Sequence, residues 1–243
     1  MNQPTPTIRL RGSLAPTWLT CSLRATHEAM EGRETVLAGP VEVATEFGNR
    51  VHAAITGHES DAPGSIIYDE HTPTANALKW QSTDAVRAAQ EALAEHRVTR
   101  REAELSARVT ALGVEVLVTG TLDLVIEHED SAVSLFDLKT GRMDQRSALA
   151  QMAIYAYLGH HAGGWTLRDV VLLHVPRARN RPGTPYQEFS LLRRPADRLI
   201  VEAEAMIRQV ALAAQSPTAA PGIHCGRCAN TECVFHPEND DAC

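Results

Sequence analysis

The sequence contains no apolar stretch of membrane-spanning length and no segment with the pattern of a signal peptide. We therefore expect a cytoplasmic protein that does not enter the membrane, in a reducing compartment where structural disulfides are rare. The sequence also lacks a Gly-x-x-x-x-Gly-Lys-Ser/Thr phosphate loop, so we do not expect this chain to unwind DNA by itself. The sequence shows no internal repeat. What it does have is an apolar content of 44%, enough for a substantial core in 243 residues.

Positive charge is scarce. The chain has 23 lysines and arginines against 30 aspartates and glutamates, a formal net charge of −7. This balance argues mildly against nucleic-acid binding, because neutralising phosphates normally requires a basic surface, but it does not exclude a local basic groove. The arginines that could line such a groove are Arg142, Arg146, Arg177, Arg179, Arg181, Arg193 and Arg194. The run from Arg177 to Arg181 is also typical of a solvated turn.

Two consecutive apolar segments each carry an acidic residue. In residues 120–127, large apolar side chains occupy every second position from Leu122 to Ile126, and Asp123 occupies a position between them. This alternation predicts a strand. Residues 132–139 are apolar and partly β-branched, which predicts a strand buried on both faces and carrying Asp137. The polar link between the two segments is short enough for a hairpin, so the two carboxylates are expected side by side.

The residues around these carboxylates suit metal chemistry. Lys139 follows Asp137 by two positions, so both side chains share one side of the strand, about 6 to 7 Å apart, while Leu138 faces the other side. Burying a carboxylate and an ammonium group on a strand costs free energy of desolvation, so we expect the two charges to pair with each other or to take part in a site. Asp123 and Asp137 offer oxygen ligands for a hard cation, and the imidazole of His52 would make Mn²⁺ at least as suitable as Mg²⁺.

A helix predicted over residues 147–158 supplies two further polar side chains. Gln151 and Tyr155 are four residues apart and therefore project from one face of that helix. They could hold a nucleic-acid backbone or steady Lys139. Each motif alone has an ordinary structural explanation, but their joint order favours a site.

One nuclease superfamily uses these motifs in this order. The motifs Gly48-x-x-x-His52, Gly120-x-x-Asp123, Asp137-x-Lys139 and Gln151-x-x-x-Tyr155 together resemble the RecB-type branch of the PD-(D/E)XK nucleases. The resemblance implies that His52, Asp123, Asp137 and the Leu138 carbonyl hold Mg²⁺ or Mn²⁺. It also implies that Lys139 is catalytic with Asp123 and Asp137, and that Gln151 and Tyr155 complete the site and contact DNA.

Cysteine is placed unevenly along the chain. Cys21 lies near the start, and Cys225, Cys228 and Cys233 lie near the end, and four thiolates are enough for one iron–sulfur cluster. This placement is similar to the iron–sulfur subgroup of RecB-like nucleases, which includes the CRISPR-associated adaptation exonuclease with its phage-encoded relatives and the AddB-type nuclease domain. The resemblance implies a 4Fe-4S cluster that joins the chain ends. Two departures are Ser22, where the family often has proline, and a four-residue spacer before Cys233 where five is commoner.

Zinc is the alternative metal for the cysteines. With His236, the three late cysteines form a local Cys-x2-Cys-x4-Cys-x2-His array, whose thiolates and imidazole suit tetrahedral Zn²⁺. We favour the iron–sulfur cluster because zinc leaves Cys21 without a role, whereas a Cys-x2-Cys pair alone fits either metal.

The order of elements predicts an α/β fold with a mixed central sheet flanked by helices, the PD-(D/E)XK restriction-endonuclease-like core, and an iron–sulfur region that joins the chain ends. The other expected elements are an irregular lead-in over 1–15, a short helix with Trp18 and Cys21, helices over 41–56 and 84–96, a loop over 57–74, strands over 170–175 and 186–192, and a helix from Pro195. We expect one nuclease domain over 1–243, divided into an N-terminal segment 1–40 with one cluster cysteine, a core 41–215, and a C-terminal cysteine cluster with an acidic tail 216–243.

The expected function is that of a metal-dependent DNA nuclease, an exonuclease that acts on single-stranded DNA or DNA ends through metal-activated water. It would need exposed ends or a recombination, helicase or CRISPR integration partner. Two alternatives are a non-catalytic nucleic-acid-binding subunit of a recombination or CRISPR adaptation complex and a zinc-stabilised interaction protein. The presence of Asp123, Asp137 and Lys139 counts against the first, and metal-dependent cleavage would discriminate against the second.

Overall fold

The computed structural model describes residues 7–31, 52–53, 55–56, 90–91, 93–94, 96–140, 144–175, 190–222, 225, 228, 230 and 233–235. Several predicted features lie outside these residues: the loop over 57–74, Gly48, Arg142, Arg177, Arg179, Arg181, His236 and the start of the strand predicted over 186–192. The described pieces of the helix predicted over 41–56, residues 52–53 and 55–56, are helical.

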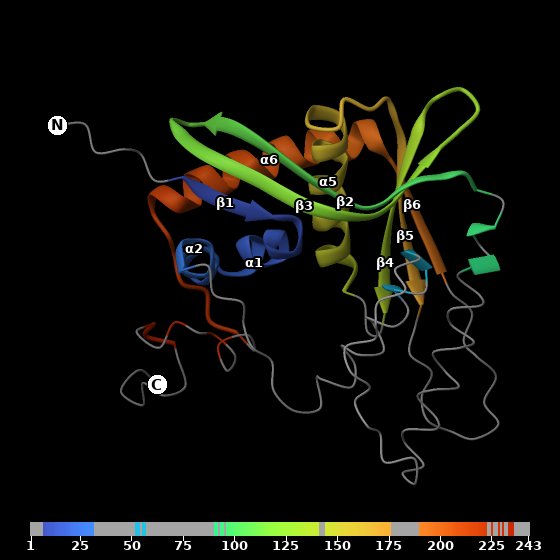
Figure 1. The fold of residues 1–243 in the computed structure, drawn as a ribbon. Coiled ribbons are helices and arrows are strands. Elements are labelled where there is room, and N and C mark those ends of the chain that lie inside the picture. The colour runs from blue at the N-terminus through green and yellow to red at the C-terminus, as the bar shows by residue number, and fades with distance from the viewer. Residues whose placement is uncertain are drawn as a thin grey trace, which may run out of the picture.

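A mixed sheet forms the centre of the described part of the chain (Figure 1). Its strands are β1 (Ile8–Arg11), β2 (Val98–Ala111), β3 (Val114–Glu127), β4 (Val133–Thr140), β5 (Leu167–Val175) and β6 (Ser190–Pro195). The strand order is β1-β3-β4-β5-β6, and β2 pairs with β3. The pairs β1–β3 and β4–β5 are parallel, and the others are antiparallel. The predicted mixed sheet and the hairpin that joins the two acidic strands are therefore confirmed.

Helices cover one face of this sheet. They are α1 (Ala15–Thr20), preceded by a short 3-10 turn (Gly12–Leu14), then α2 (Ser22–Glu31), α5 (Gln145–His161) and α6 (Ala196–Gln215). Figure 1 shows α5 standing between the β1–β2–β3 part of the sheet and strands β4 to β6, with α6 running across it. None of the described helices is both long and apolar enough to cross a membrane.

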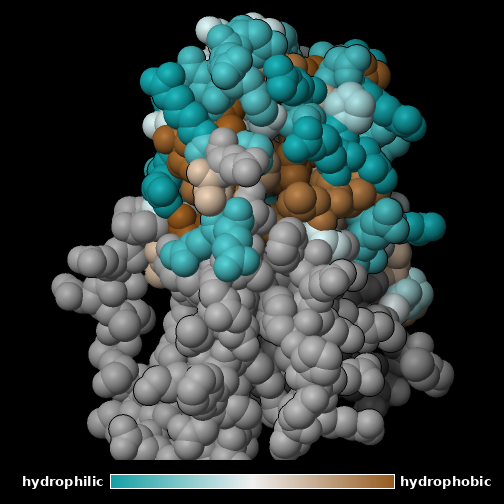
Figure 2. All heavy atoms as spheres, turned by 90° about the vertical axis from the view of Figure 1, so that its right-hand side faces the viewer, coloured by the Kyte–Doolittle hydropathy of each residue, from teal (hydrophilic) through white to brown (hydrophobic). Residues whose placement is uncertain are grey.

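The core lies on both faces of β4. On the helical face, Leu135 belongs to a cluster with side chains of α1, α5 and α6. On the opposite face, Phe136 and Leu138 pack with Ile55 and Leu93. Since the first six residues of β4 are all buried, the prediction of a strand buried on both faces is confirmed. Elsewhere, hydrophilic side chains alternate with hydrophobic patches on the side of the molecule that Figure 2 presents.

The last long helix follows its predicted pattern. Pro195 is the N-cap of α6, and its fixed φ suits a chain that changes there from strand to helix. Leu199, Ala203, Met206 and Val210, at helical spacing, are all buried. The amphipathic helix predicted from Pro195 is therefore confirmed.

The N-terminal region differs from its prediction. Residues 8–11, expected to be part of an irregular lead-in, form β1, which pairs in parallel with residues 116–119 of β3. A strand of four residues is too short to show a clear alternation, and its partner is more than a hundred positions away. Cys21, expected within a short helix, is the extended residue between α1 and α2.

The two ends of the described chain meet at α2. The amide of Leu23 donates to the Thr218 carbonyl at 3.1 Å. The Ser22 hydroxyl donates to the same carbonyl at 3.1 Å and accepts from the Thr218 amide at 3.0 Å. Figure 1 shows the C-terminal segment beside α2. These bonds hold the segment that follows α6 against the N-terminal helices.

A close approach between β3 and α5 generates the first prediction. A Cβ atom added at Gly120 would lie 2.9 Å from the Tyr155 ring and 3.0 Å from Leu158. We expect Gly120→Val to lower the free energy of unfolding by about 1 to 3 kcal/mol, because a side chain there must displace the ring. Urea denaturation measures the loss. Thr110→Val, at an exposed position of β2, is the control, and equal midpoints for both variants would contradict the close packing.

Candidate metal and catalytic site

Two carboxylates lie side by side where β3 and β4 pair. The antiparallel register pairs Leu124 with Phe136, which places Asp123 beside Asp137. One oxygen of Asp123, Oδ2, accepts a hydrogen bond of 2.6 Å from the amide of Leu138. The Asp123 side chain is thus fixed to the backbone of the strand that carries Asp137.

His52 joins this pair from a segment about seventy residues earlier in the chain. Its Nε2 donates to the Leu138 carbonyl oxygen at 3.1 Å, and its Nδ1 lies 3.4 Å from Oδ1 of Asp123. Burial alone would lower the pKa of His52, but the hydrogen bond and the negative charge of Asp123 outweigh it and raise that pKa. The imidazole, the Asp123 carboxylate and the Leu138 carbonyl therefore converge on one point.

Asp137 is a buried charge with one close cation. It is 2% exposed, and its Oδ2 lies 2.8 Å from Nζ of Lys139. Burial raises the pKa of Asp137 to about 6, although Lys139 opposes this shift. The Lys139 contact lacks hydrogen-bond geometry, so Oδ2 is a buried oxygen without a hydrogen-bond donor. Lys139 is 31% exposed and thus reaches solvent from this pair.

Helix α5 holds the other oxygen of Asp137. Asp144 caps the start of α5 by accepting from the Ser147 amide at 2.9 Å. Two turns further on, Nε2 of Gln151 is 3.5 Å from Oδ1 of Asp137 and donates to the Tyr155 hydroxyl at 2.5 Å. Burial and the charge of Asp137 raise the pKa of Tyr155, so its hydroxyl keeps its proton. Both side chains are buried, with Gln151 set between Tyr155 and the carboxylate.

Four further residues position this site, and the sequence motifs did not indicate their roles. Gly12 and Gly120 leave room for the Tyr155 ring, which a Cβ at either position would meet at 2.9 Å. The Arg101 guanidinium donates to the Ile55 carbonyl, and a Glu102 carboxylate oxygen accepts from Thr56 at 3.4 Å. Both contacts tie the segment after His52 to β2. Glu102 also has a φ of 48°, which is uncommon for a residue with a side chain.

The donor set fits a hard divalent cation. Asp123, Asp137 and the Leu138 carbonyl offer oxygen atoms, His52 offers nitrogen, and Oδ2 of Asp137 is a buried oxygen that no hydrogen bond satisfies. In the residues that the structure describes, no three His, Cys, Asp or Glu side chains are already arranged as a metal-binding group. A cation would therefore have to compete with the present contacts among His52, Asp123 and Lys139.

The arginines predicted to line a basic groove are only partly described. Arg146 is exposed in the first turn of α5, two residues after Asp144. Arg193 forms an ion pair of 3.2 Å with the buried Asp169. Arg142, Arg177, Arg179 and Arg181 lie outside the described residues, so the groove stays a prediction.

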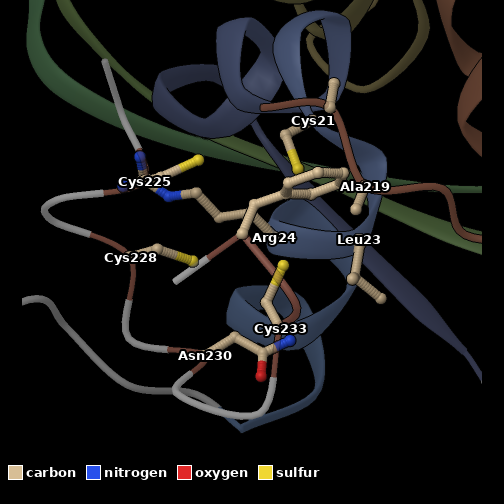
Figure 3. A pocket seen from close by; sticks show the side chains of 10 residues that line it. Cys21, Leu23, Arg24, Ala219, Cys225, Cys228, Asn230 and Cys233 are labelled. Carbon is tan, nitrogen blue, oxygen red and sulfur yellow. The ribbon is translucent and has the colours of Figure 1, made fainter. Parts of the chain in front are cut away.

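Four of the five cysteines line one cavity between the chain ends. None of Cys21, Cys225, Cys228 and Cys233 is in a disulfide, and the four line a space of about 10 Å³, room for about one water molecule. In Figure 3 the four sulfur atoms point towards a common space, across which the Arg24 side chain lies. The donor set suits a cluster or zinc, but a metal centre would require Arg24 to move.

The buried charge of Asp137 generates the second prediction. A carboxyl whose pKa is raised on folding binds protons more tightly when folded, so stability falls as pH rises from about 4 through about 6. In a chelator, we expect Asp137→Asn to melt above the wild type at pH 8, by an amount corresponding to about 3 kcal/mol, and to lose this advantage near pH 4. Thermal melting at both pH values measures it. Asp144→Asn, at the exposed cap of α5, is the control and should gain nothing; a gain for both variants would contradict the assignment to burial.

The sequence matches one family of known proteins over most of its length. A family described as the PD-(D/E)XK nuclease superfamily matches residues 13–233. No protein with a curated description matches the sequence. Among solved structures, an alkaline exonuclease (LHK-Exo) from Laribacter hongkongensis is similar with a TM-score of 0.47 and 12% identity over 86% of this chain and 88% of its own. The crystal structure of SSO0001 has a TM-score of 0.39 and 13% identity over 85% and 78%. Because the family match spans nearly all of the described residues, the chain belongs to the PD-(D/E)XK nuclease superfamily.

Proposed function

We propose that the protein is a metal-dependent deoxyribonuclease that removes nucleotides from DNA ends. The convergence of His52, Asp123, Asp137 and the Leu138 carbonyl, with Lys139 at 2.8 Å from Asp137, carries this proposal. Members of the superfamily generally use Mg²⁺ or Mn²⁺, and the oxygen-rich donor set suits either ion. These four residues would hold the ion. Once bound, it would acidify water and neutralise charge on the phosphate.

The protein's own groups have separate tasks in this proposal. Lys139 reaches solvent beside Asp137, so its ammonium group can hold the attacking water or stabilise the charge that develops on a phosphate oxygen. Gln151 holds Oδ1 of Asp137, while Oδ2 lies beside Nζ of Lys139. Tyr155, which stays protonated, positions Gln151. Because Tyr155 is buried, we assign it this positioning role in preference to stacking against a base.

We further propose that Cys21, Cys225, Cys228 and Cys233 hold one metal centre, a 4Fe-4S cluster in preference to zinc. Four cysteines from both chain ends line one cavity and form no disulfide, which supports the proposal. The hydrogen bonds between Ser22, Leu23 and Thr218 already bring these segments together, so a centre there would reinforce an existing contact. Zinc held by the three late cysteines and His236 would leave Cys21 outside the centre.

Cleavage of end-labelled DNA tests the nuclease. We expect the wild type to degrade single-stranded or end-exposed DNA with Mn²⁺ or Mg²⁺ and not with chelator. Lys139→Ala should lose activity by about a hundredfold or more, because no other described cation is as close to Asp137. Comparing 5′- and 3′-labelled strands gives the polarity.

The control for this assay is Arg168→Ala. Arg168 forms a comparable ion pair of 2.8 Å with Asp130, but both side chains are on the surface and away from the carboxylates. It should retain full activity and the same melting temperature as the wild type. Equal activity of the wild type and Lys139→Ala would point to a contaminating nuclease, and absence of cleavage in all proteins would favour a DNA-binding subunit.

Variants of the cysteines test the second centre. We expect Cys21→Ala and Cys228→Ala to lose bound metal and to lower the melting temperature, because each removes a ligand that joins the chain ends. Iron and zinc analysis, with visible absorption, distinguishes a cluster from zinc. Asn230→Ala, which changes the same cavity without removing a thiol, is the control. Full metal content in Cys21→Ala together with loss in Cys228→Ala would exclude a centre that joins the two ends.

A further inference from the structure

Strands β4 and β5 end at the same edge of the sheet, next to the candidate site. The two strands are parallel, and Figure 1 shows their arrowheads side by side. Their register pairs Lys139 of β4 with His174 of β5. His174 is paired in turn with Ser190, the first residue of β6. We call Lys139, His174 and Ser190 the edge row, because they lie in register across three neighbouring strands.

The buried clusters show which face of the sheet His174 occupies. Leu172 belongs to the cluster on the helical face, whereas Leu173 belongs to the cluster on the opposite face. Because side chains alternate along a strand, His174 lies on the helical face with Leu172. The Ser190 hydroxyl oxygen is 3.5 Å from Nδ1 of His174, so the Ser190 side chain is on this face too.

Lys139 and the carboxylate of Asp137 occupy the same face. Leu135, two positions before Asp137, belongs to the helical cluster. Asp137 itself contacts Gln151 of α5, and Lys139 contacts Asp137 at 2.8 Å. The irregularity in the pairing of β4 with β5 comes earlier, between residues 133 and 134. The edge row is therefore connected to the candidate site by contacts as well as by register.

Exposure increases along the edge row away from Asp137. Asp137 is 2% exposed and the side chain of Lys139 is 31% exposed, whereas His174 is half-buried and Ser190 is exposed. Neighbouring strands are about 4.8 Å apart, so the backbone of His174 lies one strand, and that of Ser190 about 10 Å, beyond Lys139. An ammonium group, an imidazole and a hydroxyl can each donate a hydrogen bond to a phosphate oxygen. The edge row thus places three such groups in a line that starts beside Asp137.

We propose that His174 and Ser190 bind the phosphate next to the scissile phosphate, so that the DNA strand crosses the edge of the sheet from β4 towards β6. This inference rests on the proposed nuclease function and adds the direction of the substrate. Lys139 contacts Asp137 and serves the scissile phosphate, whereas His174 is one strand further away and serves the neighbouring phosphate. Ser190 holds the ring of His174 and adds a second donor. These contacts go to the DNA backbone, so they are independent of base sequence.

Cleavage kinetics test this contact. We expect His174→Ala to raise KM for a single strand about tenfold and to leave kcat unchanged, because a phosphate outside the reacting bond is bound equally in the ground state and the transition state. His174→Gln, which keeps an N–H donor, should recover most of the affinity. Ser190→Ala, at an exposed position, should raise KM about threefold. His160→Ala is the matched control and should match the wild type, because His160 is an exposed histidine roughly 13 Å beyond Gln151 along α5.

Modified DNA locates the phosphate that is bound. Once the wild type has identified the first linkage that is cleaved, each of the two flanking phosphates is replaced in turn by a neutral methylphosphonate. His174→Ala should raise KM no further on one of these strands, because the charged partner of the imidazole is missing there, and should have its full effect on the other. Ser190→Ala gives the same comparison if His174→Ala does not fold. An undiminished effect on both strands, or a fall in kcat with unchanged KM, would overturn the contact.

Binding in chelator separates this contact from the nuclease function. Chelator stops metal-dependent cleavage and leaves Lys139 in place, so the Kd values of the variants for one strand can be compared. We expect His174→Ala to weaken binding about tenfold and His160→Ala to leave it unchanged. Weaker binding by His174→Ala without any cleavage by the wild type would contradict the nuclease and leave the contact standing. Metal-dependent cleavage with equal Kd and equal KM for the wild type and His174→Ala would leave the nuclease standing and overturn the contact.

Discussion

The contact on which the candidate site depends is the pairing of β3 with β4, because it places two carboxylates next to each other inside a packed sheet. Asp123 accepts from the Leu138 amide, so its position follows the backbone of β4. Asp137 is buried, and a buried charge is costly unless it is compensated. Lys139 and Gln151 supply that compensation from the same strand and from α5. In the proposed function, the bound cation completes it.

In the protein without a cation, the buried charge of Asp137 is only partly compensated, because its Oδ2 has no hydrogen-bond donor. Burial also raises the pKa of Asp137, so we expect its negative charge to lower the stability of the folded protein. A residue selected only for folding would be replaced by an amide or an apolar side chain of similar size. A carboxylate at this position therefore favours a functional role for its negative charge. Active sites commonly contain residues that lower the stability of the fold.

The sequence predicted the parts of this arrangement that follow from local pattern. The apolar run through Asp137 indicated a strand buried on both faces, and the short polar link indicated the hairpin. The four-residue spacing placed Gln151 and Tyr155 on one face of α5. It did not predict β1, the extended conformation of Cys21, or the space that Gly12 and Gly120 leave for Tyr155. Each of these depends on contacts between distant segments, which no short pattern records.

Those long-range contacts connect the cysteine cavity with the carboxylates. Cys21 follows α1 directly, and α1 follows Gly12, against which the Tyr155 ring packs. Tyr155 in turn accepts from Gln151, which lies against Asp137. A shift of the N-terminal segment would thus reach the carboxylate through packed side chains and a hydrogen bond, without any contact between cysteine and substrate. The proposed metal centre at the chain ends would therefore influence the proposed chemistry without contact with the substrate, because it would fix the segment on which the orientation of Asp137 depends.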